Sequence, residues 1–451
     1  MMSFVCRRTA LSILGAAVFF CAVSRNASAA TVVVTPPLTV PCKSLASYPT
    51  ISLAIASVPA NSTIFVCPGT YPEQLLITKS LTITGVAGNG LTGGTAVGAN
   101  NPVITVPAGG VLVNAADLYN AQPIAAQIAV LPGTGPVNVK LNNLAVDGSN
   151  NLLPDCSVDL VGIYYQNTSG TINEMATRFQ ELAPDLFGCQ DGLAIYVESG
   201  YMTGGTAVVT IENNSVHDYD KNGITADGSG TVATIIGNYV VGIGATPLIA
   251  QNGIQVSDGA TGSVKNNTVT DDNYISPNGG PYYSATGILL YDSGTLSAGI
   301  TVSGNTVSSS QGGIVTYGDS FGTADNNSIT LNKITTSPAA GPYQLDGIDM
   351  CSNHNTATSN TVFNSSGSGV HIDSTCTEST GQSGNNSTVT KNTINEACAG
   401  VLLGSGSGNT VGGIGNANDF YNVVQTTQAG DACPAGAPVG AKPRLKPQPR
   451  H

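Results

Sequence analysis

The sequence has 451 residues, of which 41% are hydrophobic and only 9% are charged, and its formal net charge is −12. An acidic chain of this kind argues against nucleic acid and anionic lipid as partners, because both repel negative charge. The chain also contains 55 glycines, but its hydrophobic residues are too many and too regularly spaced for a disordered protein.

The first 29 residues have the three parts of a secretory signal peptide. A basic segment, 1–8, precedes an apolar segment, 9–23, and Ala27-Ser28-Ala29 matches the small-residue pattern of a cleavage site. Cleavage leaves 12 Lys and Arg against 27 Asp and Glu, a net charge of −15. No later apolar run is long enough to cross a bilayer. We therefore expect a secreted, periplasmic or cell-surface protein without a membrane span.

A short helix and three strands are predicted next. The helix is placed at 48–58, because apolar residues follow the i, i+3, i+4, i+7 spacing of an amphipathic helix: Ile51, Ala54, Ile55 and Val58. We expect it to cap the open end of the structure that follows, since an uncovered strand edge promotes aggregation. The strands are predicted at 64–66, 75–77 and 81–84.

The segment 63–85 resembles the opening of proteins of the pectin lyase-like superfamily. That opening has a T-I-x-V strand, a P-G-T-Y-x-E turn and a K-S-L-T-I-x-G strand. They stand here as Thr63-Ile64-Phe65-Val66, Pro68-Gly69-Thr70-Tyr71-Pro72-Glu73 and Lys79-Ser80-Leu81-Thr82-Ile83-Thr84-Gly85. The resemblance implies a parallel β-helix of the kind found in parallel β-helix repeat proteins. It carries no catalytic residue, because this fold supports different activities.

A repeat of about 30 residues runs through most of the remaining chain. Each unit has an Asn followed two residues later by Val or Ile, and then a Gly followed by alternating apolar residues with the period of a strand. The asparagines are Asn214, Asn238, Asn267, Asn305, Asn332, Asn360 and Asn392. The glycines are Gly162, Gly192, Gly223, Gly253, Gly287, Gly313, Gly347, Gly369 and Gly400.

This repeat predicts a single all-β domain, residues 30–433, folded as a right-handed parallel β-helix of about a dozen coils. No segment after residue 160 offers the helical stripe that a crossover helix requires. The asparagines should stack as a ladder of amides inside a turn. Residues 434–451 are rich in proline and basic residues and predict a disordered tail. We expect the protein to be a monomer.

An even number of cysteines in an exported chain predicts disulfides. We expect consecutive cysteines to pair, although eight cysteines allow many connectivities. A zinc site is a rival interpretation, and the wide spacings without a C-x-x-C pair disfavour it. The eight are Cys42, Cys67, Cys156, Cys189, Cys351, Cys376, Cys398 and Cys433.

Candidate catalytic residues gather on one predicted face. After each repeat glycine, the second and fourth residues should point outward. This rule places Asp349 beside His371, and Asp373 about 8 Å from Asp349. Carboxyl groups about 6.5–9.5 Å apart suit an inverting glycosidase. Tyrosines on this face and on two flanking Gly-Pro-Tyr loops could stack on sugar rings: Tyr282, Tyr283, Tyr291, Tyr317 and Tyr343.

A second resemblance adds Asp346 to this group. The segment 346–349, Asp-Gly-Ile-Asp, is similar to the N-T-D-G-I-D segment of polygalacturonase-type glycoside hydrolases, with Asp346 at the position of a catalytic aspartate. Most of the remaining motif is absent. The G-D-D and G-H-G elements are replaced by Ser366-Gly367-Ser368 and Cys398-Ala399-Gly400.

We therefore expect a protein that binds or processes an extracellular polysaccharide, with Asp346, Asp349, His371 and Asp373 as catalytic candidates. Hydrolysis is favoured over β-elimination, because no basic residue is placed to take a sugar proton. The alternative is a non-catalytic, adhesin-like structural protein, since an acidic surface can bring such groups together by chance. No cofactor or metal is expected: Asp271-Asp272 could face Ca²⁺, but this ion takes roughly six to eight oxygens.

Overall fold

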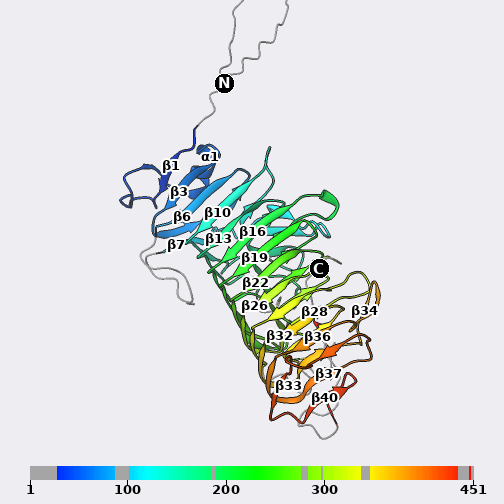
Figure 1. Ribbon diagram of the computed structural model, residues 1–451. Coiled ribbons are helices and arrows are strands. Elements are labelled where there is room, and N and C mark those ends of the chain that lie inside the picture. Colours follow the sequence, from blue (N-terminus) through cyan, green and yellow to red (C-terminus); the bar gives the residue numbers. More distant parts are fainter. Residues whose placement is uncertain are drawn as a thin grey trace, which may run out of the picture.

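The structure is a computed structural model that describes residues 28–86, 101–183, 186, 188–275, 283–295, 298–336, 346–434 and 446–447. They form one right-handed parallel β-helix, which confirms the predicted fold (Figure 1). The predicted signal peptide lies outside the described residues except for Ser28 and Ala29. Of the predicted tail, only Pro434, Lys446 and Pro447 are described, and Lys446–Pro447 forms strand β41.

Sheet A is one wall of the β-helix and has 14 strands. Its order is β2 (Ala46–Tyr48), β1 (Thr31–Val34), β3 (Ser62–Val66), β6 (Leu81–Gly85), β10 (Asn138–Asn142), β13 (Ser169–Asn173), β16 (Ala207–Glu212), β19 (Thr231–Ile236), β22 (Thr261–Lys265), β26 (Thr301–Ser303), β29 (Ser328–Thr330), β32 (Thr356–Thr358), β36 (Thr388–Thr390) and β38 (Thr410–Val411). All its pairs are parallel.

Sheet B forms the rest of the wall with 23 strands, and most coils contribute two of them. Its strands are β4 (Gly69–Pro72), β5 (Leu75–Ile77), β7 (Pro102–Thr105), β8 (Ala115–Ala116), β9 (Pro123–Val130), β11 (Ala145–Asp147), β12 (Asp159–Gln166), β14 (Ala176–Arg178), β15 (Leu193–Glu198), β17 (Ser215–His217), β18 (Asn222–Asp227), β20 (Tyr239–Thr246), β21 (Asn252–Ser257), β23 (Thr268–Tyr274), β25 (Thr286–Tyr291), β27 (Thr306–Ser310), β28 (Gly312–Tyr317), β30 (Lys333–Thr336), β31 (Ile348–Cys351), β33 (Thr361–Ile372), β37 (Thr393–Leu403), β39 (Asp419–Tyr421) and β40 (Gln425–Ala429). Four short strands lie in loops: β24 (Tyr283–Ser284), which pairs with β41, and β34 (Thr377–Glu378), which pairs with β35 (Gly381–Gln382).

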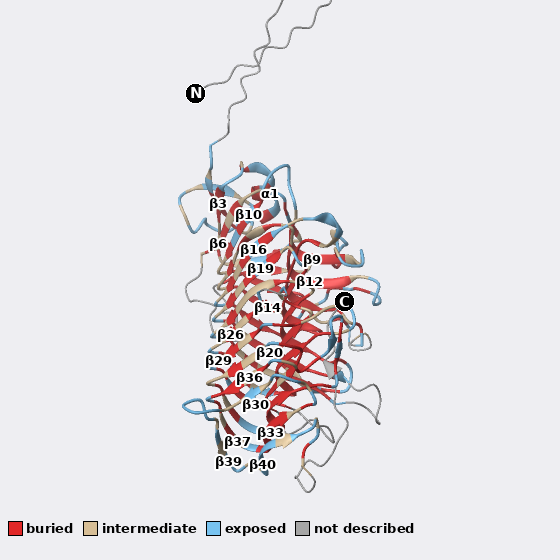
Figure 2. Ribbon diagram, turned by 45° about the vertical axis from the view of Figure 1, so that its right-hand side comes forward, coloured by how far each residue is buried: buried red, intermediate tan, exposed pale blue. Residues whose placement is uncertain are grey.

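The core is a stack of aliphatic side chains inside the coils. Buried residues follow the strands along the β-helix (Figure 2). Ile224, Ile254, Ile288, Ile314 and Ile348 occupy one register position in successive coils and are completely buried. Each coil therefore covers the apolar side chains of the one before it, as expected for a solenoid.

The glycine column exists because neighbouring coils approach too closely there for a side chain. A Cβ atom at Gly313 would lie 2.1 Å from the carbonyl oxygen of Gly347. One predicted member of the column is wrong. Leu193 pairs with Asn222, so Ala194 rather than Gly192 stands in this position.

The asparagine ladder is confirmed. Each side-chain Nδ2 donates to the Oδ1 of the asparagine in the next coil over 2.8–3.0 Å, and a second bond from Nδ2 reaches a backbone carbonyl. The ladder contains every predicted asparagine and ends one coil later, at Asn418. These buried amides are thus fully hydrogen-bonded, which makes their role structural.

The predicted cap helix is α1 (Ile51–Ser57), at the N-terminal end of the coils (Figure 1). Thr50 caps it by accepting a bond from the N–H of Leu53, and the carboxylate of Glu73 accepts from the N–H groups of Ile51 and Ser52. A carboxylate is favourable here because the first N–H groups of a helix have no partner within the helix.

Four disulfides join consecutive cysteines, as predicted: Cys42–Cys67, Cys156–Cys189, Cys351–Cys376 and Cys398–Cys433. Disulfides of this kind persist in oxidising compartments, in line with the expected export. Among the described residues, no helix has the length and apolar character needed to cross a membrane.

Candidate active site

Two columns of side chains run along the outside of sheet B, at the second and fourth residues after each position of the glycine column. We call this surface the column face. The first column holds Tyr164, Tyr196, Thr225, Gln255, Leu289, Val315, Asp349, His371 and Leu402, and the second holds Gln166, Glu198, Asp227, Ser257, Tyr291, Tyr317 and Cys351. These residues lie outside the central core, so the predicted outward direction is confirmed.

The column face is nevertheless covered over most of its length. Of its members, only Gln166 and Asp349 are partly exposed, and the others are buried. The sequence analysis expected a solvent-exposed face, and this expectation was wrong because loops pack onto the strands. Cys376, in one such loop, packs with Leu289 and Val315 in an apolar cluster outside the coils.

The structure brings Asp346, Asp349 and His371 together. Asp349 of β31 and His371 of β33 are neighbours in the strand register, as predicted. Oxygen atoms of Asp346 and Asp349 and a ring nitrogen of His371 lie within 4.8 Å of one another. Two carboxyl groups and an imidazole therefore meet at one point of the column face.

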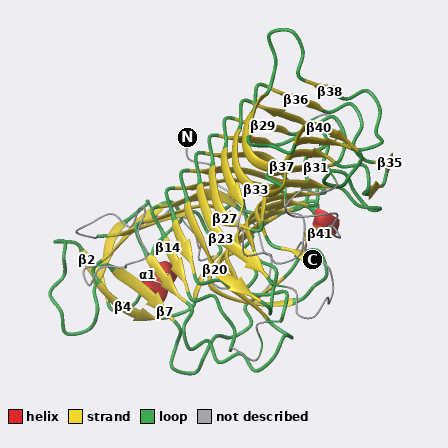
Figure 3. Ribbon diagram, turned by 90° about the horizontal axis from the view of Figure 1, so that it is seen from below, coloured by secondary structure: helices red, strands yellow, loops and turns green. Residues whose placement is uncertain are grey.

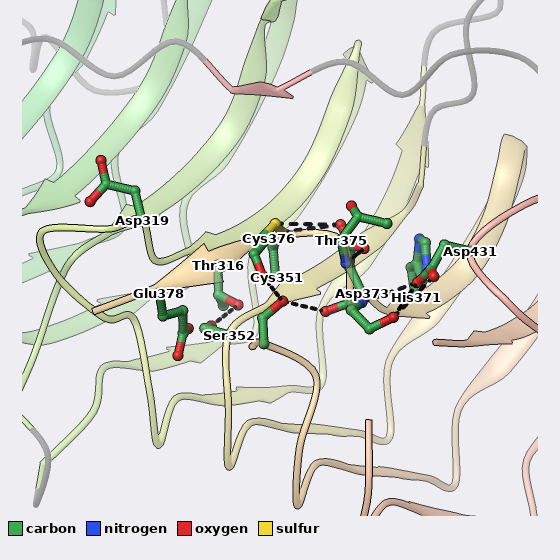
Figure 4. Close-up of a disulfide and its surroundings, with 12 residues drawn as sticks. Thr316, Asp319, Cys351, Ser352, His371, Asp373, Thr375, Cys376, Glu378 and Asp431 are labelled. Atoms are coloured by element: carbon green, nitrogen blue, oxygen red, sulfur yellow. Dashed lines mark hydrogen bonds and ion pairs between the residues drawn. A yellow bond between two sulfur atoms is a disulfide. The ribbon is translucent and has the colours of Figure 1, made fainter. Parts of the chain in front are cut away.

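His371 is completely buried between two carboxylates. Its Nδ1 lies 3.3 Å from Oδ2 of Asp346. On the other side of the ring, its Nε2 lies 3.1 Å from Oδ1 of Asp431 (Figure 4). Asp431 also accepts a bond from the N–H of Ser374. Burial alone would raise the pKa of Asp431, but the bonds from His371 and Ser374 hold it below its ordinary value.

The side chain of Asp346 is buried and held by hydrogen bonds. Its Oδ1 accepts bonds of 2.7 Å from both the N–H and the hydroxyl of Ser368 in the next coil. Only Oδ2 faces His371. The position implied by the polygalacturonase resemblance is therefore used, at least in part, to orient the imidazole.

Asp373 directly follows strand β33 and lies beside the Cys351–Cys376 disulfide. Its Oδ1 accepts a bond of 2.8 Å from the N–H of Thr375, and its Oδ2 lies 3.1 Å from the sulfur of Cys351. Oxygens of Asp373 and Asp431 lie within 4.8 Å of a nitrogen of His371 (Figure 4). We call the five residues Asp346, Asp349, His371, Asp373 and Asp431 the C-terminal cluster.

Of the three predicted sugar-stacking tyrosines that the structure describes, two are buried and one is exposed. Tyr291 and Tyr317 stack on each other with ring centroids 5.8 Å apart, and both are buried. Tyr283, on the short strand β24, is exposed. Tyr282 and Tyr343 lie outside the described residues.

A second polar group, missed from the sequence, occupies the N-terminal part of the column face. The Tyr196 hydroxyl lies 3.0 Å from Oε2 of Glu198, 3.1 Å from Oδ2 of Asp117 and 3.3 Å from Oδ2 of Asp227. The hydroxyl of Tyr164 also donates to Glu198. We call Asp117, Tyr164, Tyr196, Glu198 and Asp227 the N-terminal cluster.

Glu198 is fully buried at the centre of the N-terminal cluster. The N–H of Leu118 contacts both of its oxygens at 3.0 Å, so the loop after β8 closes over it. Burial, reinforced by the nearby Asp117 carboxylate, raises the pKa of Glu198 to about 8. This carboxyl group therefore holds a proton at neutral pH.

Carboxyl groups continue from the N-terminal cluster along the following coils. Burial and the Asp227 carboxylate raise the pKa of Asp258 to about 10. Burial and Asp319 raise the pKa of Asp292 to about 7, while the N–H of Asp319 donates to Asp292 over 3.1 Å. The Tyr291 hydroxyl donates to Asp319 over 2.7 Å. These carboxyl groups therefore keep their protons to a higher pH than an ordinary aspartate does.

Potential metal ligands are present in and beside the C-terminal cluster, but several of their ligand atoms are already engaged in other contacts or in a disulfide bond. His371 contacts a carboxylate through each ring nitrogen, and Cys351 and Cys376, which lie near Asp373, are joined as a disulfide. The residues considered for Ca²⁺ do not form a surface loop site, because Asp272 is fully buried and accepts a 2.6 Å bond from the Tyr219 hydroxyl.

Two of these features differ in how visible they are in the sequence. Asp227 stands at the fourth position after Gly223, so extending the outward rule to this coil would have found it. Glu198 stands at the fourth position after Ala194, and the rule counted from Gly192 misses it. Asp431 has no such signal. It follows His371 by 60 residues and arrives from a segment outside the repeat.

Comparison with known proteins identifies the fold. A family model described as right handed beta helix region matches residues 142–334 and 201–413. Among curated protein sequences, none matches this chain.

Several solved structures are similar. The GH136 lacto-N-biosidase from Eubacterium ramulus has a TM-score of 0.50 and 11% identity over 87% of this chain and 68% of that chain. DFA-IIIase from Arthrobacter chlorophenolicus A6 has a TM-score of 0.42 and 14% identity over 78% and 77%. The catalytic unit of the GH87 alpha-1,3-glucanase from Streptomyces thermodiastaticus strain HF3-3 has a TM-score of 0.41 and 14% identity over 87% and 67%. At these identities the similarity is one of fold. Because the two family matches together span residues 142–413, more than half of the chain, the protein belongs to the right-handed β-helix family.

Proposed function

We propose that the protein binds an extracellular polysaccharide and hydrolyses it at the C-terminal cluster. The observation that carries this proposal is the close approach of Asp346, Asp349 and His371, whose oxygen and nitrogen atoms lie within 4.8 Å of one another. Asp349 is the partly exposed member of the three. It is therefore the group that a substrate can reach, while Asp346 and His371 hold charge and protons behind it.

The chemistry follows from the paired carboxyl groups. Hydrolysis of a glycosidic bond needs one carboxyl group as the acid and another as the nucleophile or base. The Asp346–Asp349 spacing is closer to the roughly 5–5.5 Å of retaining enzymes than to the roughly 6.5–9.5 Å of inverting ones. We therefore favour retention. Asp349 attacks the anomeric carbon while the His371–Asp346 pair gives its proton to the leaving glycosidic oxygen, and water then hydrolyses the glycosyl ester and returns a proton to the pair.

The fold is compatible with this proposal. The lacto-N-biosidase with a similar fold is named for a glycan substrate, although the similarity itself extends to the fold alone. An acidic protein of net charge −12 also suits a neutral glycan better than an acidic one, because like charges repel.

A non-catalytic scaffold is the second candidate. It is favoured by the burial of His371 and Asp373, which are 0% and 1% exposed. In this case the stacked coils would present a stable surface that binds a glycan, or none, without turnover.

The experiment starts with a panel of neutral glucans, galactans and fructans, tested for binding and for new reducing ends. On a substrate that is cleaved, Asp349→Asn should lower turnover by at least about 10²-fold, the usual contribution of a positioned acid or base. Its thermal unfolding should change little, because the side chain is partly exposed. Asp155→Asn, at an exposed loop position, is the matched control and should retain full activity.

A variant at Glu198 tests whether the site lies in the other cluster. Full activity in Asp349→Asn combined with loss in Glu198→Gln would move the site to the N-terminal cluster and contradict the proposal. His371→Ala is a poor substitute for this test. It removes a buried contact to Asp431 and should therefore lower stability as well as activity.

A further inference from the structure

The two ends of the β-helix are built differently. At the N-terminal end, α1 covers the first coils, and its apolar residues Ile51, Ala54 and Ile55 are buried. At the C-terminal end, the last coil consists of β38, β39 and β40. Among the described residues these strands pair only with β36 and β37, the strands of the preceding coil, so their other edge has no strand partner (Figure 3).

The C-terminal end is also partly apolar. In the preceding coil the core residues Val389 and Ile394 are completely buried. In the last coil, Phe420 and Val423 pack against the core but remain partly exposed, and Tyr421 is 56% exposed. The end of the core is therefore incompletely covered, which is unfavourable for a protein that remains alone in water.

The described parts of the C-terminal segment lead away from this end. Cys433 is bonded to Cys398 in the preceding coil, and Asp431 contacts His371, one coil further back. The strand Lys446–Pro447 pairs with β24, which lies several coils closer to the N-terminus. These contacts place residues 431–434 and 446–447 along the side of the β-helix. Within the described part of the chain, no strand pairs with the outer edge of the last coil, which is open to another occupant.

We propose that the occupant is a second copy of this chain, joined end to end about a twofold axis. Two identical open edges related by such an axis run antiparallel, so their free N–H and C=O groups can pair. Natural edge strands are normally protected by Lys, Pro or a bulge. Strand β40, with the sequence QTTQA, has no charged residue and no proline.

The backbone of β40 shows which groups face outward. The N–H of Val424 donates to the carbonyl oxygen of Ala397, and the carbonyl oxygen of Thr426 lies against Gly400. The backbone N–H and C=O groups of the even-numbered residues therefore point toward the preceding coil. Alternation along a parallel strand then turns the N–H of Thr427 toward the open edge. Proline at position 427 removes this N–H and leaves the bonds to the preceding coil in place.

The test is the mass in solution of the chain from Ala30 to His451, measured by sedimentation equilibrium up to concentrations on the order of 100 μM. We expect twice the chain mass, and a monomer for Thr427→Pro with an unchanged thermal transition. Thr427→Val keeps the N–H and should remain dimeric. Gln428→Pro removes an inward N–H and should lower the melting temperature.

Two results would overturn the proposal. One is a wild-type chain that stays monomeric over the whole range, and the other is a Thr427→Pro variant that dimerises as well as the wild type. If the wild-type chain stays monomeric, a shorter chain ending at Pro434 tests whether the residues after 434 cover the end of the last coil. If only this shorter chain dimerised, the residues after 434 would be what covers the end.

Discussion

Replacing Asn305 with alanine is expected to lower the free energy of unfolding by about 2–6 kcal/mol. Asn305 is fully buried in the middle of the asparagine ladder. Its Oδ1 accepts bonds from the backbone N–H and the Nδ2 of Asn267, and its own Nδ2 donates to the carbonyl of Val264. Alanine takes this partner away from two groups, the N–H of Asn267 and the carbonyl of Val264, while Nδ2 of Asn267 keeps its bond to the carbonyl of Ile235. Each buried group left in this way costs about 1–3 kcal/mol.

Asn418 provides the matched control, because it is the last member of the ladder and is only partly buried. Water can reach the groups that Asn418→Ala leaves open, so the loss should be clearly smaller. Chemical denaturation followed by circular dichroism at fixed pH measures both variants. Equal losses at the two positions would show that the amide ladder is not what stabilises the middle of the β-helix.

The free energy of unfolding is also expected to fall as the pH rises from about 5 to 8. Several buried carboxyl groups have folded-state pKa values far above the usual 4 or so, so the folded protein keeps protons that the unfolded chain has lost. Each such group removes about 1.4 kcal/mol per pH unit until its folded pKa is passed. The groups are Glu198, Asp220 and Glu378 at about 8 and Asp292 at about 7, with burial as the largest cause in each.

Denaturation in urea at several pH values tests this slope, and Glu198→Gln isolates one contribution. Glutamine resembles the protonated form of Glu198 and does not titrate. Between pH 5 and 7, the free energy of unfolding of the variant should therefore fall less steeply than that of the wild type, by about 1.4 kcal/mol per pH unit. Stability that instead rises over this range would mean that the carboxylates are ionised in the folded protein and that bound cations neutralise them.

The fold was readable from the sequence because its rules are local and repeat in every coil. The spacing of Asn267 and Asn305 and the apolar alternation after Gly287 were enough to predict coils, ladder and inward direction. The exception, Ala194, shows that one coil of the column has room for a Cβ atom.

The candidate site was only partly readable, because loop packing does not repeat. The register correctly placed Asp349 beside His371. It could not indicate that Asp431 would close over His371, or that a disulfide loop would bury Tyr317. Long-range contacts of this kind depend on where a non-repeating segment folds back, and the sequence alone carries no period from which to deduce them.

The disulfide pattern also determines how the protein would respond to proteases. Cys398 and Cys433 enclose the whole last coil, including the exposed turn at 413–417. A cut in this turn would leave both fragments covalently attached and still stacked on the coil before them. The nicked chain would therefore migrate intact on a gel until a reducing agent is added. Damage of this kind would therefore be contained within a single coil.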